Sequence, residues 1–277
     1  MRIAIFQGPE QVSTPQQALD LLARTASDAA GRGARLLICP EMYLTGYNIG
    51  PDAARRLAEA ADGPSAQSVM RIARDTGIAI LYGYPERGAG GHIYNSAQLI
   101  GRDGRIVAAY RKTHLFGEID RAAFAPGMAA PEVVALDGLR IGILICYDVE
   151  FPENVRALAL KGADLVAVPT ALMQPFDIVA RTIVPARAYE NQVFLAYADR
   201  CGSEGELSYC GLSCVIAPDG SDLARAGRSE SLIIADLDVE RLTQSRKLNT
   251  HLDDRRPELY DALTGRERSI HMKDARS

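Results

Sequence analysis

Apolar residues follow two patterns that alternate along this chain. Short apolar runs bounded by glycine, proline or charged residues predict buried strands, and apolar residues three or four positions apart predict helices between them. The predicted strands cover residues 2–7, 36–39, 78–82, 93–100, 105–110, 139–145, 165–168, 193–198, 212–217 and 232–237. Helices are predicted from residue 15 to the glycines at 31 and 33, and over residues 53–61, 64–75, 152–161 and 176–190. This alternation is typical of an α/β fold.

Local signals define several boundaries of these elements. Thr14 is a predicted N-cap, with Pro15 in the first turn and Gln17 at the position that closes a capping box. Gly101-Arg-Asp-Gly104 predicts a hairpin between two strands, and Pro218-Asp219-Gly220 predicts a turn between the last two strands.

No linker or change of composition divides the chain, so residues 1–277 are predicted to form one domain. The polar and charged residues from about 249 to 277 are expected to form an arm over the surface or over a partner subunit.

Composition and charge exclude several classes of function. The chain has 277 residues, 47% of them hydrophobic and 24% charged, with a formal net charge of -4. Both signs of charge are mixed along the sequence, so neither nucleic acid nor an anionic membrane is expected as a partner. No apolar stretch is long enough to span a bilayer, and the first residues indicate a strand and no signal peptide. Five cysteines, an odd and small number, argue against a disulfide framework, and a cytoplasmic location is expected.

Three predicted strands end on side chains that can carry out chemistry. Cys146 follows the apolar run 139–145, Glu41 follows 35–40, and Lys112 follows 105–111. A thiolate is the reactive form of cysteine, and a turn from strand to helix offers backbone N–H groups that stabilise it. We therefore expect Cys146 to be a nucleophile, Glu41 a general base, and Lys112 a stabiliser of an oxyanion together with the Tyr147 backbone N–H. Such a site hydrolyses a C–N bond without a metal or cofactor.

Each of these residues taken alone also has a structural explanation. Cys146 fits a buried core cysteine, Glu41 a charge at a helix start, and Lys112 a solvated strand end. Their joint occurrence in specific surroundings favours catalysis.

The surrounding segments resemble a known family. Cys39-Pro-Glu41-Met-Tyr-Leu-Thr-Gly-Tyr-Asn48, Tyr110-Arg-Lys112-Thr-His-Leu-Phe116 and Ile145-Cys146-Tyr-Asp-Val-Glu-Phe-Pro-Glu153 are similar, in order and spacing, to three segments of the nitrilase (carbon–nitrogen hydrolase) superfamily. The resemblance covers residue 2 to about residue 240. It implies a four-layer αββα sandwich that pairs as αββα–αββα in a homodimer, and a Glu41–Lys112–Cys146 triad.

A fourth acidic group is less well defined by the sequence. Many family members carry a glutamate at the position that Asp120 occupies when the chain is matched backward from Phe124-Ala-Pro-Gly127. Glu118 is two residues earlier, and we favour Glu118 over Asp120 as the supporting acid. The alternative is that one of them only pairs with Arg111 or Arg121.

Within the superfamily, four segments are similar to δ-aminovaleramidases (5-aminopentanamidases) and to amidases stereoselective for amino-substituted carboxamides. They are Thr45–Gly50, Gly83–Arg87, His114–Arg121 and Cys146–Asn154. The expected substrate is therefore a small aliphatic amide that carries an amino group. N-carbamoyl hydrolase, aliphatic nitrilase and an inactive metabolite-binding protein are the alternatives.

Residues around the triad are expected to bind this substrate. Glu150 stands where many members have arginine, and its carboxylate suits a cationic amine. The alternative is that Glu150 caps the helix predicted to begin at Pro152. Tyr47, Thr170 and Ala171 are also expected to contact substrate, whereas His114 is expected to support the site through hydrogen bonds.

Overall fold

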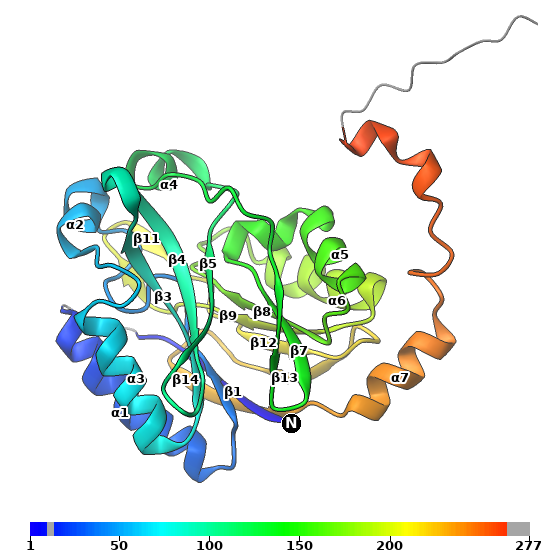
Figure 1. Cartoon of the computed structure of the whole chain (residues 1–277), viewed down its shortest axis with the longest axis horizontal. Helices are drawn as coiled ribbons and strands as arrows, with labels where there is room; N and C mark the ends of the chain where they lie inside the picture. The colour runs from blue at the N-terminus through cyan, green and yellow to red at the C-terminus, as the bar shows by residue number, and fades with distance from the viewer. Residues whose placement is uncertain (10–13, 265–277) are drawn as a thin grey trace, which may run out of the picture.

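Two six-stranded sheets pack face to face in the computed structural model, which describes residues 1–9 and 14–264 (Figure 1). In spatial order, the first sheet contains β14 (Ser231–Asp236), β1 (Arg2–Gln7), β2 (Leu36–Ile38), β3 (Ala79–Arg87), β4 (Ile93–Ile100) and β5 (Ile106–Arg111). The second contains β13 (Asp222–Arg225), β12 (Cys214–Ile216), β9 (Phe194–Ala198), β8 (Leu165–Pro169), β7 (Leu139–Ile143) and β6 (Val133–Leu136). In each sheet, three neighbouring strands are parallel: β1, β2 and β3 in the first, and β7, β8 and β9 in the second.

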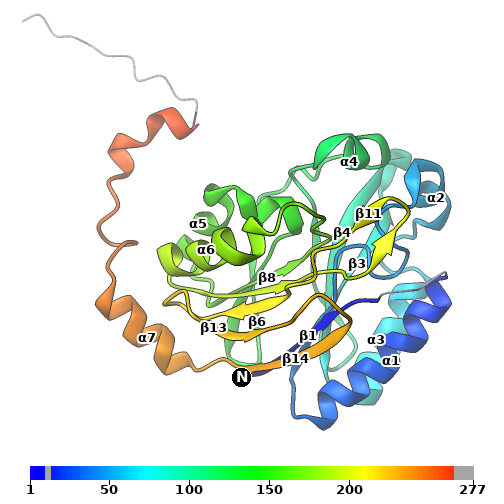
Figure 2. The ribbon, with the colours of Figure 1, turned by 180° about the vertical axis from the view of Figure 1, so that it is seen from behind.

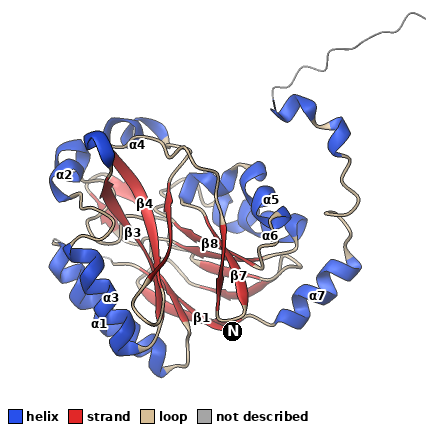
Figure 3. Ribbon diagram, in the orientation of Figure 1, coloured by secondary structure: helices blue, strands red, loops and turns tan. Residues whose placement is uncertain are grey.

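Helices cover the outer face of each sheet, which gives four layers (Figure 3). The first sheet is covered by α1 (Pro15–Gly31) and α3 (Pro64–Thr76), and the second by α5 (Pro152–Leu160) and α6 (Val184–Asn191). The remaining helices are α2 (Gly50–Leu57), α4 (Gly117–Ala123) and α7 (Val239–Leu248). Short 3₁₀ turns cover Ala89–Gly91, Cys146–Glu150, Pro257–Leu259 and Asp261–Thr264, a π-helical turn covers Val179–Ile183, and a small hairpin pairs β10 (Ser203–Glu204) with β11 (Leu207–Ser208). The predicted αββα architecture is confirmed.

The alternation of side chains along the strands builds the two sides of the first sheet. Ile3 and Ile5 of β1 belong to the core between the sheets, whereas Ala4 and Phe6 pack with the apolar residues of α1 and α3. Successive residues of a strand point to opposite faces, so a strand covered on both faces is apolar throughout. This explains why the central strands were visible as continuous apolar runs.

Most of the predicted boundaries are confirmed. Thr14 caps α1, since its side chain accepts a hydrogen bond from the Gln17 N–H. The Gly101–Gly104 turn joins β4 to β5.

Six helices and strands were absent from the prediction, namely α4, α7, β6, β10, β11 and β13, and two expectations were wrong. The turn at Pro218–Gly220 leads into β13, which pairs with β12, so the last two predicted strands are not consecutive. The helix predicted over 176–190 is a π-helical turn followed by α6. Strand β13 is a mostly half-buried edge strand without an apolar run, and α7 buries only Leu242. Together with the short α4 and the two-residue strands β10 and β11, they lack the periodicity on which the prediction depended. Strand β6 is an apolar run of only four residues that the prediction missed.

The described C-terminal residues leave the body of the molecule after β14. Figure 2 shows α7 and the following residues extending away from the sheets. Among the described residues, no helix combines the length and the apolar character needed to cross a membrane.

Candidate active site

Glu41, Lys112 and Asp120 form a buried charge cluster at one end of the two sheets. Lys112 directly follows β5, and its Nζ lies 2.8 Å from Glu41 Oε1 and 2.7 Å from Asp120 Oδ2. The three side chains are shielded completely from solvent. Two carboxylates therefore share a single ammonium group, and the cluster is left with an excess of negative charge when all three are ionised.

The two oxygens of the Glu41 carboxylate have different surroundings. Oε1 accepts hydrogen bonds from Lys112 Nζ and, at 2.6 Å, from Asn95 Nδ2 in β4. Oε2 is buried, and no residue in the described part of the chain bonds to it. This oxygen is the one available to accept a proton.

The cluster shifts the pKa values of its members. Burial raises the pKa of Glu41, and the negative charge of Asp120 adds to this effect, whereas Lys112 and the hydrogen bond from Asn95 oppose it. Burial by itself lowers the pKa of Lys112, but the charges of Glu41 and Asp120 outweigh burial and hold it well above its ordinary value. Lys112 is therefore a permanent cation, and Glu41 is the group that can exchange a proton.

Cys146 lies on a sharp turn three residues after the end of β7. Its φ angle is +47°, in the left-handed region that non-glycine residues seldom adopt, and it opens the 3₁₀ turn Cys146–Glu150. Burial raises the pKa of the Cys146 thiol well above its ordinary value, and the charge of Glu41 raises it further. Lys112, the Thr170 hydroxyl and the Ala171 backbone N–H act in the opposite direction. Cys146 in the resting site is therefore a thiol that needs a base to become reactive. The charges of Glu41 and Lys112 both act on its sulfur.

The buried Asp148 carboxylate connects the cysteine turn to the lysine segment. It accepts hydrogen bonds from the backbone N–H groups of Ile145 and His114 and from the hydroxyls of Tyr110 and Thr113. The His114 ring also lies 2.8 Å from Asp148, a contact that fits the expected supporting role of this histidine. Asp148 thus links Ile145, which precedes the cysteine, to Tyr110, Thr113 and His114, which lie before and after Lys112 in the sequence.

Two glycines allow the backbone of the site to pack closely. A Cβ on Gly83 in β3 would lie 2.4 Å from the Met42 nitrogen, and a Cβ on Gly127 would lie 2.4 Å from the Arg111 carbonyl oxygen. Real Cβ atoms do not approach backbone so closely, so these positions admit only glycine. The segments that carry Glu41 and Lys112 therefore depend on these two residues.

A cavity of about 210 Å³ opens onto the nucleophile. Its lining comprises Tyr47, Phe116, Cys146, Tyr147, Glu150, Ala171, Leu172, Met173 and Phe176. Tyr47, Tyr147, Glu150 and Ala171 were assigned to substrate binding from the sequence. Thr170 lies immediately behind this wall, where its hydroxyl donates to Tyr197 and its carbonyl accepts from the Glu41 N–H.

Glu150 is half-buried in this cavity, and its surroundings do not support the capping alternative. The N-cap of α5 is Phe151, and no side chain caps this helix. Arg187, whose charge acts on Glu150, donates to the carbonyls of Val149 and Glu150 and to the Glu190 carboxylate. In residues 1–9 and 14–264, no ion pair involves the Glu150 carboxylate, and burial raises its pKa.

The sequence favoured Glu118 over Asp120 as the acid beside Lys112, and the positions of the two side chains contradict this preference. Asp120 contacts Lys112, whereas Glu118 is exposed to solvent at the start of α4. Two positions along an α-helix differ by about 200° in direction, so only one of the two acids can face the lysine. The Asp120 carboxylate is fixed further by the Phe116 N–H, at 2.8 Å from its Oδ2.

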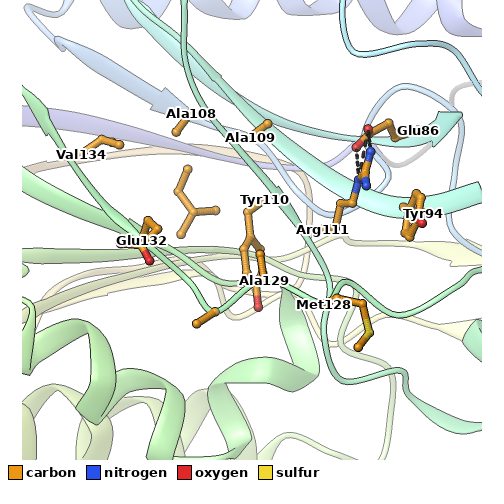
Figure 4. Close-up of a pocket in the computed structure, with 12 residues that line it drawn as sticks. Glu86, Tyr94, Ala108, Ala109, Tyr110, Arg111, Met128, Ala129, Glu132 and Val134 are labelled. Atoms are coloured by element: carbon orange, nitrogen blue, oxygen red, sulfur yellow. Dashed lines mark hydrogen bonds and ion pairs between the residues drawn. The ribbon is translucent and has the colours of Figure 1, made fainter. Parts of the chain in front are cut away.

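A second depression, of about 460 Å³, lies along the edge strand β5 and extends to β6 and β7 (Figure 4). Alanine and aliphatic side chains form most of its wall, and Arg111 pairs with Glu86 at one end. Arg111 lines this depression, whereas the next residue, Lys112, belongs to the buried charge cluster.

Sequence reasoning overlooked several residues that shape the site. Asp148 lies inside a recognised segment, but its five donors come from residues that are up to 38 positions away. Phe116 and Phe176 form an edge-to-face pair in the cavity wall, with centroids 5.9 Å apart. No local pattern distinguishes these two aromatic residues from core residues.

Comparison with known proteins gives a consistent result. Residues 2–247 match the carbon-nitrogen hydrolase family. The chain is 52% identical over 269 residues to a "Hydrolase in pqqF 5'region" of Pseudomonas protegens. This alignment covers 96% of this chain and 93% of that protein. It is 38% identical over 222 residues to an "(R)-stereoselective amidase" of a Pseudomonas species, with 80% and 79% of the two chains covered.

Solved structures agree with this result. A cysteine-to-alanine mutant of the amidase from Nesterenkonia sp. AN1, in complex with butyramide, superimposes with a TM-score of 0.81 at 36% identity. The match covers 95% of this chain and 96% of that one. The chain therefore belongs to the carbon–nitrogen hydrolase family, in the nitrilase superfamily, and is a hydrolase related to amidases.

Proposed function

We propose that this hydrolase converts small aliphatic carboxamides that carry an amino group, such as 5-aminopentanamide, into the carboxylic acid and ammonia. The observation that carries the proposal is the buried Glu41–Lys112 pair, whose charges act on Cys146, behind a cavity that Cys146 lines. Among the described residues that line this cavity, Glu150 is the one with a charged side chain.

The first half of the reaction forms a thioester. Glu41 Oε2 accepts the Cys146 proton while the sulfur attacks the amide carbon, and the carbonyl oxygen becomes an oxyanion. Lys112 and the Tyr147 backbone N–H stabilise that charge, and each such donor typically contributes about 3 kcal/mol. Protonated Glu41 then gives its proton to the leaving nitrogen, the C–N bond breaks, and ammonia leaves.

The second half releases the acid. Glu41 removes a proton from a water molecule, whose oxygen attacks the thioester carbon, and a second oxyanion forms in the same position. The C–S bond breaks, the carboxylic acid leaves, and the proton held by Glu41 returns to the sulfur. Asp120 holds Lys112 in place throughout.

The wall of the cavity supports a cationic substrate. Lys112 is neutralised by Glu41 and Asp120, so Glu150 makes the cavity negative as a whole. Tyr47, Phe116 and Phe176 add aromatic rings, whose faces attract cations. A substrate carboxylate, as in an N-carbamoyl amino acid, would be repelled. The names of related amidases and the butyramide complex of the Nesterenkonia enzyme also support a small amide as substrate.

Ammonia release from a panel of amides, nitriles and N-carbamoyl compounds tests this proposal. We expect 5-aminopentanamide to give ammonia and acid in equal amounts, and Cys146→Ala to abolish both products. Carbon dioxide alongside ammonia would instead identify a carbamoyl hydrolase, and turnover of nitriles alone would identify a nitrilase. A folded wild-type protein that binds amides without any turnover would be an inactive family member.

We also propose one catalytic domain with a C-terminal arm from about residue 249, which forms a homodimer in the cytoplasm. The family match ends at residue 247, and the described part of the arm extends from the body. All five cysteines are free and buried, which suits a compartment that keeps thiols reduced.

A further inference from the structure

The β10–β11 hairpin (Ser203–Glu204, Leu207–Ser208) lies beside the substrate cavity and binds the segments on both of its sides. On one side, Glu204 Oε2 accepts the backbone N–H groups of Tyr47 and Asn48, at 2.9 and 2.7 Å. The Glu204 carbonyl also accepts the Asn48 side-chain amide at 2.9 Å. Tyr47 lines the cavity, so the Glu204 carboxylate fixes the backbone of a residue that faces the proposed substrate.

The opposite strand of the hairpin holds the other wall. The Gln174 N–H donates to the Ser208 carbonyl at 2.9 Å, and Met173 pairs with Tyr209 in a β-bridge. Met173 lines the cavity as well. In Figures 1 and 2 the hairpin lies next to α2, which follows the Tyr47 segment.

The Glu204 carboxylate is itself fixed from behind. It pairs with Arg200, which is buried, and its Oε2 accepts the Tyr209 hydroxyl at 2.8 Å. The same guanidinium donates to the carbonyls of Glu41 and Met42, at 3.5 and 3.3 Å. The carboxylate thus receives donors at both oxygens, and a neutral amide in its place has only one oxygen that can accept.

We propose that Glu204 is a positioning residue that sets the place of Tyr47 in the substrate cavity and thereby determines KM and the preferred length of the amide. This inference depends on the proposed amidase function. Glu204 does not line the cavity, and it acts through the backbone of Tyr47. Longer amides reach farther along the cavity wall, so displacement of Tyr47 weakens their binding most.

The test compares Glu204→Gln with Glu206→Gln, the same change at an exposed position of the same hairpin. KM and kcat are measured for acetamide and 5-aminopentanamide. For Glu204→Gln we expect KM for 5-aminopentanamide to rise about fivefold or more, a smaller rise for acetamide, and kcat within about twofold of wild type. Glu206→Gln should stay within about twofold of wild type in both constants.

Several outcomes would overturn the inference. They are an unchanged KM for both amides, an equal rise for both, and a fall in kcat at constant KM. If Glu204→Gln does not fold, Tyr209→Phe decides, because it removes one donor to the same oxygen and should raise KM in the same direction by less. If the wild-type protein hydrolyses neither amide, both the proposed function and this inference are wrong. If the wild type turns over the amides and KM is unchanged in the variants, only the inference is wrong.

Discussion

At the scale of single residues, the site depends on an imbalance of buried charge. Glu41 and Asp120 share Lys112, and none of the three is exposed. Burial disfavours the ionised carboxylate and raises the pKa of Glu41, and the negative charge of Asp120 adds to this effect. The proposed base is therefore able to hold a proton between the steps of the reaction.

This charge balance predicts the pH dependence of activity. Glu41 is active as a base only when ionised, and its pKa lies above the ordinary value of 4.5. We therefore expect the acid limb of kcat/KM to have its midpoint above pH 4.5. Asp120→Asn removes a negative charge that raises the pKa of Glu41, so the limb should move to lower pH.

The same variant should lower kcat by about tenfold or more, because Lys112 loses a partner that orients it toward the oxyanion. Glu118→Gln is the matched control, and its profile should follow that of the wild type since Glu118 is exposed. A limb that stays in place in Asp120→Asn, or moves upward, would contradict the assignment.

The Glu150 carboxylate predicts substrate selectivity. In Glu150→Gln, KM for 5-aminopentanamide should rise about tenfold, because the variant loses the charge that attracts the ammonium group. KM for the neutral amide butyramide should change by less than about twofold. The ratio of the two KM values is the measurement, and an unchanged ratio would exclude Glu150 from substrate recognition.

At the scale of elements, the site depends on how closely strand β3 approaches the segment after β2. Gly83 lies against the backbone of Pro40, Glu41 and Met42. A Cβ atom added at Gly83 would lie 2.4–3.0 Å from backbone atoms of these three residues. Backbone atoms cannot rotate away as a side chain can. Any larger residue must therefore displace the segment that carries Glu41.

Gly83→Ala should lower the free energy of unfolding by about 1–3 kcal/mol, as overpacked positions do. It should also reduce kcat/KM by at least about tenfold, because the Glu41 carboxylate shifts. Urea unfolding and ammonia release measure the two effects. Gly31→Ala is the control: no atom lies within 4 Å of the added Cβ, and the helical position should gain about 0.5 kcal/mol. Full activity in Gly83→Ala would show that the position of the Glu41 carboxylate does not depend on a glycine at position 83.

At the scale of the whole molecule, the outer surface of α5 and α6 carries exposed apolar side chains. Leu160 is 50% exposed and Tyr189 is 48% exposed, on helices that lie side by side over the second sheet. Leu248 at the end of α7, and Leu259 and Leu263 of the described arm, are also exposed. Surfaces of this kind commonly mark contacts between subunits, which supports the proposed homodimer.

The proposed dimer can be tested by sedimentation. The wild-type protein should sediment as a dimer, and the double variant Leu160→Asp and Tyr189→Asp should shift toward the monomer, because two charges would be buried in the interface. Ile106→Asp, an exposed apolar position on β5, is the control and should leave the dimer intact. A monomeric wild type would refute the proposal, and a dimeric double variant would place the interface elsewhere.

The sequence by itself predicted the alternation of strands and helices and, through the family resemblance, the four layers and three residues of the proposed site. Strands covered on both faces must be apolar, so the ends of β2 and β7 were visible, and Glu41 and Cys146 follow them. Lys112 follows the edge strand β5, which the hairpin signal at Gly101–Gly104 indicated. The edge strand β13 is partly exposed and carries no apolar run.

Only the tertiary structure decided which acid serves the lysine and what surrounds the cavity. The direction of a side chain on the short helix α4 selects Asp120 over Glu118. Glu204 reaches Tyr47 across 157 positions of sequence, and Asp148 reaches the lysine segment across more than 30. Contacts of this kind are set by the packing of the sheets and by the paths of the loops. Because neither follows a local periodicity, no reading of neighbouring residues could have found them.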